Sequence, residues 1–173
     1  MRPRRSRGSA ADPPATAADV RALVLHWLGQ RDLSRAQVLQ RLARRGVDPG
    51  TAEGVVARLT ADGAIDEARL ARAAARRETA IKGRGPSRTR ATLKALGLDE
   101  GTIDTALHAA FEEVDLDTLL ERALDKRLRG LPPGRLDPAA LRRIVGAMVR
   151  QGFPPGAVFA RLRRRGAEVD EPE

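Results

Sequence analysis

A short pattern that occurs three times constrains the fold of this chain more than any other feature. Gly-Val-Asp-Pro-Gly at 46–50 is matched by Gly-Leu-Asp-Glu-Gly at 97–101 and by Gly-Phe-Pro-Pro-Gly at 152–156, at spacings of 51 and 55 residues. In each copy a glycine ends one helix, an apolar residue follows, and two residues supply the cap and first turn of the next helix. This period predicts an internal repeat of about fifty residues that is built from helices.

The sequence between the copies predicts three helices for each repeat. Apolar residues from Val20 to Leu28 follow helical spacing, Ser34 and Gln37 form a capping box before the second helix, and Asp48 caps the third. No segment shows the alternation of a β-strand. We therefore expect an all-α chain of three tandem three-helix modules, each resembling a helix-turn-helix unit, in an elongated and curved array.

The predicted boundaries follow from these helices and from the composition of the two ends. The segments are a disordered basic tail at 1–16, three-helix modules at 17–64, 65–114 and 115–166, and an acidic tail at 167–173. The first helix of the second module has a weak apolar stripe, through Ala73, Ala74 and Ile81. We expect that helix to pack less tightly than the others.

Net charge and composition limit the class of partner. The chain carries a net charge of +9 with a pI near 11.3, which favours an anionic partner, either nucleic acid or an acidic protein surface. Cysteine is absent, so disulfides and thiolate chemistry are excluded. No apolar run approaches the roughly 18 residues of a membrane span, and no signal peptide is evident. We expect a cytoplasmic monomer without a membrane partner.

The charges are segregated along the predicted second module. Nine cations lie between Arg69 and Lys94 against the single acid Glu78, whereas residues 95–121 contain eight acids and no Lys or Arg. Two explanations stay open. The basic helices form a surface for an anionic partner, or they attract the acidic helix of the same module.

The basic segment contains a helix-breaking stretch at residues 82–90. Gly83 and Gly85 free the backbone, and Pro86 suits the first position of a helix. Exposed backbone N–H groups at this helix start, together with guanidinium groups such as those of Arg84 and Arg88, would suit a phosphate or a carboxylate. The alternative is a solvated face in an arginine-rich protein.

Groups that carry catalysis or bind metal are not assembled in the sequence. His26 and His108 are isolated from other metal ligands. Gly83 and Gly85 lack the further spacing of a dinucleotide fingerprint and follow no predicted strand, and no phosphate-loop Lys-Ser/Thr pair occurs. We expect no enzyme, no catalytic residue, no metal and no cofactor.

Several of these motifs together carry a resemblance. They are Leu33-Ser34-Arg35 with Leu42 and Arg-Gly-Val at 45–47, Asp-Gly-Ala-Ile-Asp at 62–66 with Arg69, Gly-Arg-Gly-Pro at 83–86 with Arg88 and Leu93, and Gly-Phe at 152–153. Over about residues 17–166 the chain resembles the RecX family, bacterial regulators of the RecA recombinase. It departs from the family pattern at Leu70, Thr89 and Thr92.

The resemblance implies a function and a set of contact residues. A RecX-like chain lies in the groove of the RecA–DNA filament and inhibits its ATPase, strand-exchange and co-protease activities, which modulates recombination, DNA repair and the SOS response. The expected contact residues are Arg84, Arg88, Arg90 and Lys94, with Arg69, Arg72 and Arg76 on the neighbouring helix, and Gly83, Gly85 and Pro86 shape the loop.

Two other interpretations compete with the resemblance. The chain could be a sequence-nonspecific helical module that binds single- or double-stranded DNA directly. It could also be a helical scaffold for an unrelated acidic protein. Affinity for bare DNA that falls steeply with salt would favour the first of these.

Overall fold

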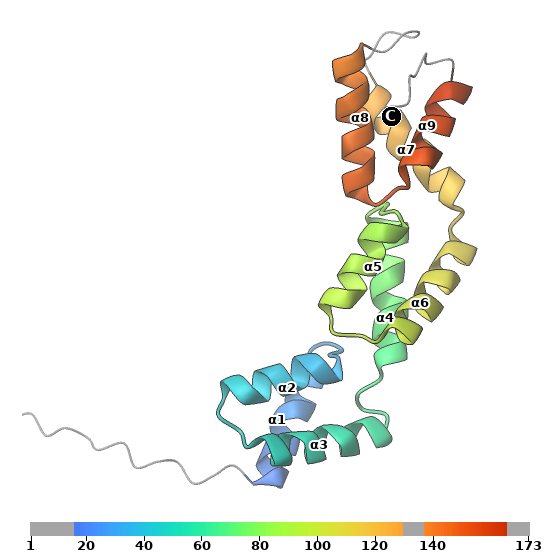
Figure 1. Ribbon diagram of the computed structural model, residues 1–173. Helices are drawn as coiled ribbons and strands as arrows, with labels where there is room; N and C mark the ends of the chain where they lie inside the picture. Colours follow the sequence, from blue (N-terminus) through green and yellow to red (C-terminus); the bar gives the residue numbers. More distant parts are fainter. Residues whose placement is uncertain (1–15, 130–136, 166–173) are drawn as a thin grey trace, which may run out of the picture. The chain divides into compact units, whose positions relative to one another are not determined.

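The computed structural model describes residues 16–129 and 137–165, and within these ranges the chain contains helices and turns but no strand (Figure 1). The all-α class is therefore confirmed. The described chain divides into two compact units, the first ending at Asp66 and the second beginning at Glu67. The predicted tails lie outside the described residues except for Thr16, and the boundaries of three modules stay a prediction.

The first unit is a three-helix group. It consists of α1 (Ala17–Leu28), α2 (Arg35–Arg44) and α3 (Pro49–Ala61). One apolar core joins the three helices and the turns that follow them. Its buried residues are Val20, Val24, Trp27, Leu33, Val38, Leu42, Ala52, Val55, Val56, Leu59 and Ile65.

The predicted caps of this unit are formed by side chains. The Ser34 hydroxyl accepts from the backbone N of Gln37 at 3.1 Å, and the Gln37 amide oxygen accepts from the backbone N of Ser34 at 3.2 Å. The Asp48 carboxylate accepts from the backbone N of Thr51 at 2.9 Å. The predicted helix starts are therefore confirmed, and each cap satisfies amides that the helix itself leaves unpaired.

The first half of the second unit packs around alanines. It contains α4 (Glu67–Arg76), a π-helical turn η1 (Arg77–Ile81), α5 (Pro86–Ala95) and α6 (Glu100–Glu113). The small side chains let α4 and α6 approach closely. The buried core residues are Ala71, Ala75, Leu93, Leu98, Ile103, Ala106, Leu107 and Ala110.

The second half of this unit has a larger core. It contains α7 (Leu116–Leu128), α8 (Pro138–Gln151) and α9 (Pro155–Arg164). The buried core residues are Leu119, Leu120, Ala123, Leu124, Ile144, Met148, Phe153, Val158 and Leu162. Phe111 packs against both cores, so the two halves are joined by apolar contact as well as by the chain.

The repeated pattern of the sequence appears as three similar turns. Gly46, Gly97 and Gly152 have φ values of 72°, 76° and 99°, in the left-handed region that favours glycine. Asp99 then caps α6 by accepting from the backbone N of Thr102 at 2.9 Å, much as Asp48 caps α3. At the third turn Pro154 makes no side-chain cap bond.

The expected apolar face of the first helix after Asp66 is partly wrong. Ala74 packs against the core, but Ala73 is exposed and Ile81 is 79% exposed. The reason is the π-helical turn. It widens the last turn of the helix, so the buried face passes from Ala75 to Glu78 and Thr79 and leaves Ile81 facing solvent.

Candidate functional site

The loop that contains Gly83, Gly85 and Pro86 forms a joint with the turn at Gly152. The backbone N of Gly85 donates to the carbonyl of Gln151 at 3.0 Å, and the backbone N of Ser87 donates to the carbonyl of Gly152 at 3.2 Å. The side-chain amide of Gln151 donates back to the carbonyl of Gly83 at 2.7 Å. Three hydrogen bonds therefore connect the start of α5 to the end of α8.

Both glycines of this joint are required by close backbone approach. A Cβ on Gly85 would lie 2.4 Å from the carbonyl oxygen of Gly152, and a Cβ on Gly152 would lie 2.5 Å from the backbone N of Arg88. Contacts that short do not occur between real atoms of this kind. Gly83 is needed for its φ of 61°, and Pro86 occupies the first position of α5 as predicted.

The expectation of free amides for an anion at this helix start is wrong for Gly85 and Ser87. Pro86 has no N–H, and the N–H groups of Gly85 and Ser87 are taken by the carbonyls of Gln151 and Gly152. Carbonyl groups at the end of α8 therefore occupy these amides at the start of α5. An anion that binds nearby thus depends mainly on side chains such as those of Arg84 and Arg88.

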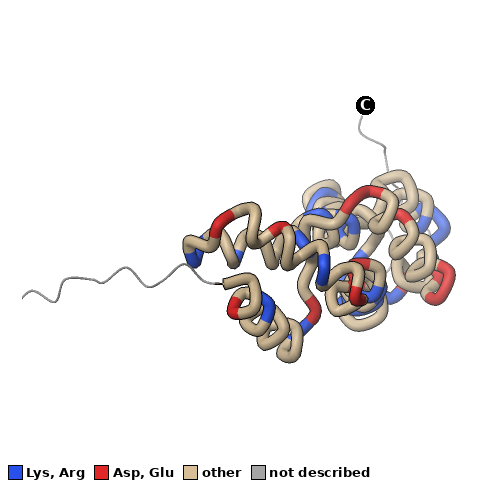
Figure 2. The backbone as a smooth tube through the Cα atoms, turned by 90° about the horizontal axis from the view of Figure 1, so that it is seen from below, with Lys and Arg blue, Asp and Glu red and all other residues tan. Residues whose placement is uncertain are grey.

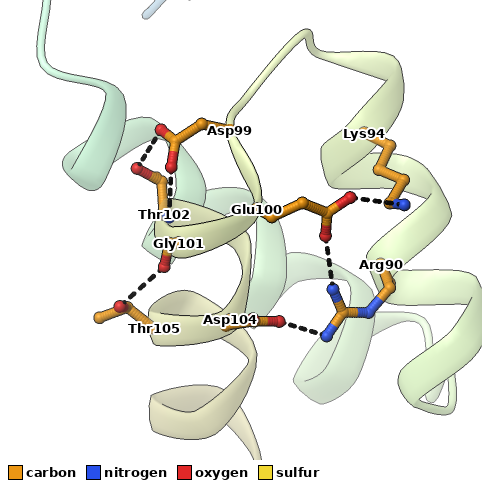
Figure 3. A network of polar contacts seen from close by, with 8 residues as sticks. All are labelled: Arg90, Lys94, Asp99, Glu100, Gly101, Thr102, Asp104 and Thr105. Atoms are coloured by element: carbon orange, nitrogen blue, oxygen red, sulfur yellow. Dashed lines mark hydrogen bonds and ion pairs between the residues drawn. The ribbon is translucent and has the colours of Figure 1, made fainter.

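Two of the expected contact residues are engaged in ion pairs with α6 (Figure 3). The Arg90 guanidinium donates to Glu100 at 2.8 Å and also to Asp104, and the Lys94 ammonium lies 2.6 Å from Glu100. The bond to Asp104 is the main cause that raises the pKa of Arg90. These ion pairs join α5 to α6. One of the two explanations for the segregated charge, attraction between helices of the same module, therefore applies to α5 and α6.

Arg84 belongs to a different arrangement, a cluster of three cations at the joint. Arg84 lies in the loop, Arg127 in the last turn of α7 and Arg150 in the last turn of α8. Burial lowers the pKa of Arg127, and the nearby charges of Arg150 and Arg84 lower it further. No carboxylate in the described part of the chain forms an ion pair with any of the three. We call these three residues the joint cluster.

The remaining expected contact residues lie on exposed faces. Arg88 is exposed on α5, next to the Gly152 turn. Arg69, Arg72 and Arg76 are exposed on α4, where they line a groove between α4 and α6. The structure therefore separates the expected set into the Arg90–Lys94 pair, the joint and the α4 face. Figure 2 colours the basic and acidic positions along the backbone.

Sequence reasoning missed Arg127 and Arg150 as parts of the joint cluster. Neither belongs to the basic run at residues 69–94. The contact between the two glycine turns brings the end of α8, which carries Arg150, to the loop that carries Arg84. A signal was present, since Gly-Arg-Gly-Pro and Gly-Phe are two of the motifs that carry the family resemblance. Nothing local in either motif shows that they meet.

The two histidines have ordinary helical partners. The Nε2 atom of His26 lies 3.2 Å from the side-chain amide nitrogen of Gln30, and that of His108 lies 3.0 Å from Glu112. Among the residues described, no group of three or more His, Asp or Glu side chains is arranged to hold a metal ion. The helices that the structure describes include none with the length and apolar character of a membrane span.

Two models of known protein domains match the chain. The model for the first three-helix domain of RecX matches residues 21–59, and the model for the second three-helix domain of RecX matches residues 66–107.

Curated relatives extend the similarity to most of the chain. A regulatory protein RecX of Halorhodospira halophila is 34% identical over 160 residues, which cover 91% of this chain and 92% of that protein. The regulatory protein RecX of Thermobifida fusca is 31% identical over 172 residues, covering 95% and 90%.

Solved structures agree on the fold. A crystal structure of regulatory protein RecX has a TM-score of 0.69 at 21% identity and covers 82% of this chain and 68% of its own. A crystal structure of RecX from Lactobacillus salivarius has a TM-score of 0.70 at 14% identity, with coverages of 86% and 96%. By these domain models and relatives, the chain belongs to the RecX family of non-enzymatic regulatory proteins.

Proposed function

We propose that this protein is a cytoplasmic, monomeric regulator that binds the RecA–DNA filament and inhibits its ATPase, strand-exchange and co-protease activities. The observation that carries the proposal is the similarity, over nine-tenths of the chain, to proteins named regulatory protein RecX. Binding would restrain recombination, DNA repair and the SOS response without any chemistry by the regulator. Several weak contacts along a filament add up, so the regulator needs no single strong site.

The proposed contact residues are those at the joint and on α4. Arg84 and Arg88 flank the joint without a described acid partner, and Arg72 and Arg76 are exposed on α4. Arg90 and Lys94 already contact Glu100, so an external anion has to compete with that carboxylate. We therefore rank Arg84 and Arg88 above Arg90 and Lys94 as residues that contact the filament.

The test is DNA-dependent ATP hydrolysis by the cognate RecA, titrated with the protein from substoichiometric to equimolar ratios. Inhibition should rise with dose and should be absent when a DNA-dependent ATPase that forms no filament replaces RecA. The double variant Arg84→Ala/Arg88→Ala should weaken inhibition with helicity unchanged. The matched control Arg122→Ala/Arg142→Ala removes two exposed arginines elsewhere in the second unit and should inhibit normally. Full inhibition by the first double variant would remove the assignment of these two arginines.

The joint cluster supports a second candidate function, direct binding of nucleic acid. Three guanidinium groups without described acid partners are a suitable environment for phosphates. This function predicts affinity for bare DNA that falls by roughly 0.9 log units per log unit of salt for each phosphate neutralised. Binding to bare DNA that depends on Arg127 and Arg150, without any effect on RecA at equimolar ratio, would replace filament regulation by DNA binding.

A further inference from the structure

A groove between α4 and α6 combines an apolar floor with a basic rim. It has a volume of about 740 Å³, and its floor includes Ala73 and Ala80 on one side and Ala106 and Ala109 on the other. At its end stands Ile81, whose side chain the π-helical turn leaves 79% exposed. A large aliphatic side chain in that position is costly in water, so the groove offers apolar surface to a partner.

The rim of this groove is a row of arginines on one face of the helix. Arg69, Arg72, Arg76 and Arg77 are spaced at i, i+3, i+7 and i+8, so their side chains project along the same wall. Arg72, Arg76 and Arg77 make no ion pair with a carboxylate of the residues described. Among the described lining residues the one acid is Glu113, on the α6 wall. The rim therefore carries a net positive charge.

We propose that this groove docks an acidic amphipathic helix of a protein partner. Alanine methyl groups leave room for a second helix to approach, and Ile81 supplies an apolar contact at one end. Acidic residues spaced three and four apart on the partner would face the arginine row. The helical segment from Arg69 to Ile81 is about 18 Å long at 1.5 Å per residue, which matches the length of about three turns of a partner helix.

The apolar floor favours a helix over nucleic acid as the occupant. A sugar–phosphate backbone would pair with the arginines but would leave the alanines and Ile81 without an apolar partner. Single strands that bind through their bases need aromatic side chains for stacking, and none of the described residues that line the groove is aromatic. The groove thus has the charge of a phosphate site without the surface that bases require.

The test uses the full-length protein and two synthetic peptides, so it is independent of the proposed function. One fluorescent peptide of about 16 residues places Glu at helical i, i+3 and i+7 positions beside a Leu face, and the second has Gln in place of each Glu. Fluorescence anisotropy should show binding of the Glu peptide that is at least tenfold tighter than that of the Gln peptide. Failure here would leave filament regulation untouched, because neither RecA nor DNA is present.

Matched variants assign the binding to the groove. Arg72→Glu/Arg76→Glu should weaken binding of the Glu peptide at least tenfold, whereas Arg122→Glu/Arg142→Glu, with the same charge change outside the groove, should change it less than about twofold. Ile81→Asp should also weaken binding at least tenfold. Its control is Val149→Asp, at an aliphatic residue that lies outside the groove and is 41% exposed.

Three outcomes would overturn the proposal. The first is absence of binding by the Glu peptide, and the second is equal loss of affinity in the groove variants and their controls. The third is binding of a single-stranded oligonucleotide that disappears in Arg72→Glu/Arg76→Glu while the peptide does not bind, which would assign the rim to nucleic acid. Since all the substituted side chains are exposed, circular dichroism should show unchanged helicity in every variant.

Discussion

Gly85→Ala is a specific test of the joint, because the backbone conformation of Gly85 is one that alanine adopts without strain. Its φ of −77° and ψ of 174° are accessible to alanine, so the cost arises from the added Cβ and its contact with the Gly152 carbonyl at 2.4 Å. An ordinary contact requires about 3.4 Å or more. The two turns therefore have to separate by roughly 1 Å, which stretches hydrogen bonds of 3.0 and 3.2 Å beyond bonding distance.

The expected magnitude follows from the bonds that are lost. Two backbone hydrogen bonds and the Gln151 side-chain bond contribute about 1 kcal/mol each, so Gly85→Ala should cost about 2–3 kcal/mol. With a urea dependence of about 1.5 kcal/mol per molar, the unfolding midpoint of the second unit should fall by roughly 1.5 M. The loss of glycine at the N-cap of α5 adds roughly 0.5–1 kcal/mol, because alanine is a much poorer N-cap residue than glycine.

Two optical signals separate the second unit from the first. Trp27 is the single tryptophan and lies in the core of the first unit, so its fluorescence follows that unit, whereas circular dichroism follows all helices. Gly85→Ala should shift the circular dichroism transition and leave the fluorescence transition in place. Gly156→Ala is the control, since a Cβ there meets nothing within 4 Å. A midpoint for Gly85→Ala within about 0.3 M of that control would refute the close-approach argument.

Three further predictions concern charged groups. Hydrogen bonds from Thr118 lower the pKa of Asp115 in the folded protein. The charged Asp115 cap therefore stabilises α7 at pH values above the unfolded pKa near 3.9, and this stabilisation is lost as the pH falls through the lowered folded pKa. Asp115→Asn should make the urea midpoint less dependent on pH in this acid range. Arg127→Gln should raise the free energy of unfolding of the second unit by up to about 0.5 kcal/mol in low salt, because it removes a cation disfavoured by burial and by its neighbours. Lys82→Met should lower the free energy of unfolding of the second unit by about 1–2 kcal/mol. The reason is that Glu78, which is 4% exposed, loses the Lys82 ammonium that lies 2.5 Å from its carboxylate. Adding Glu78→Gln to Lys82→Met should restore part of that loss. A neutral effect of Lys82→Met would contradict that pairing.

Local sequence signals predicted the helices and their ends well. Ser34, Asp48 and Asp99 cap the helices that they were expected to cap, because capping depends on a hydroxyl or carboxylate and an amide only three residues away. Gly97 and Gly152 end helices for a reason that is equally local, the left-handed φ. Apolar spacing was similarly sufficient for the buried face of α1, where Val20, Val24 and Trp27 lie in the core.

Two features could not be predicted from local patterns. The π-helical turn after Arg76 changes the helical period, so a count at 3.6 residues per turn places Ile81 on the wrong face. The pairing of Gly85 with Gly152 joins residues 67 positions apart, and the same glycines are also consistent with an open anion site. The partners of Arg90 on α6 could be expected from the segregated charge, whereas the joint cluster depends on the long-range pairing.

The joint also bears on the order in which the second unit folds. Most contacts in a helical chain are local and form quickly, but the bonds between the Gly83–Ser87 loop and the end of α8 close a loop of more than sixty residues. Closing so long a loop costs entropy before its few hydrogen bonds compensate, so these bonds should form after the transition state. Loosening the joint should then accelerate unfolding and leave the refolding rate almost unchanged. The lifetime of the folded second unit, more than its rate of formation, is the property that Gly85 and Gly152 control.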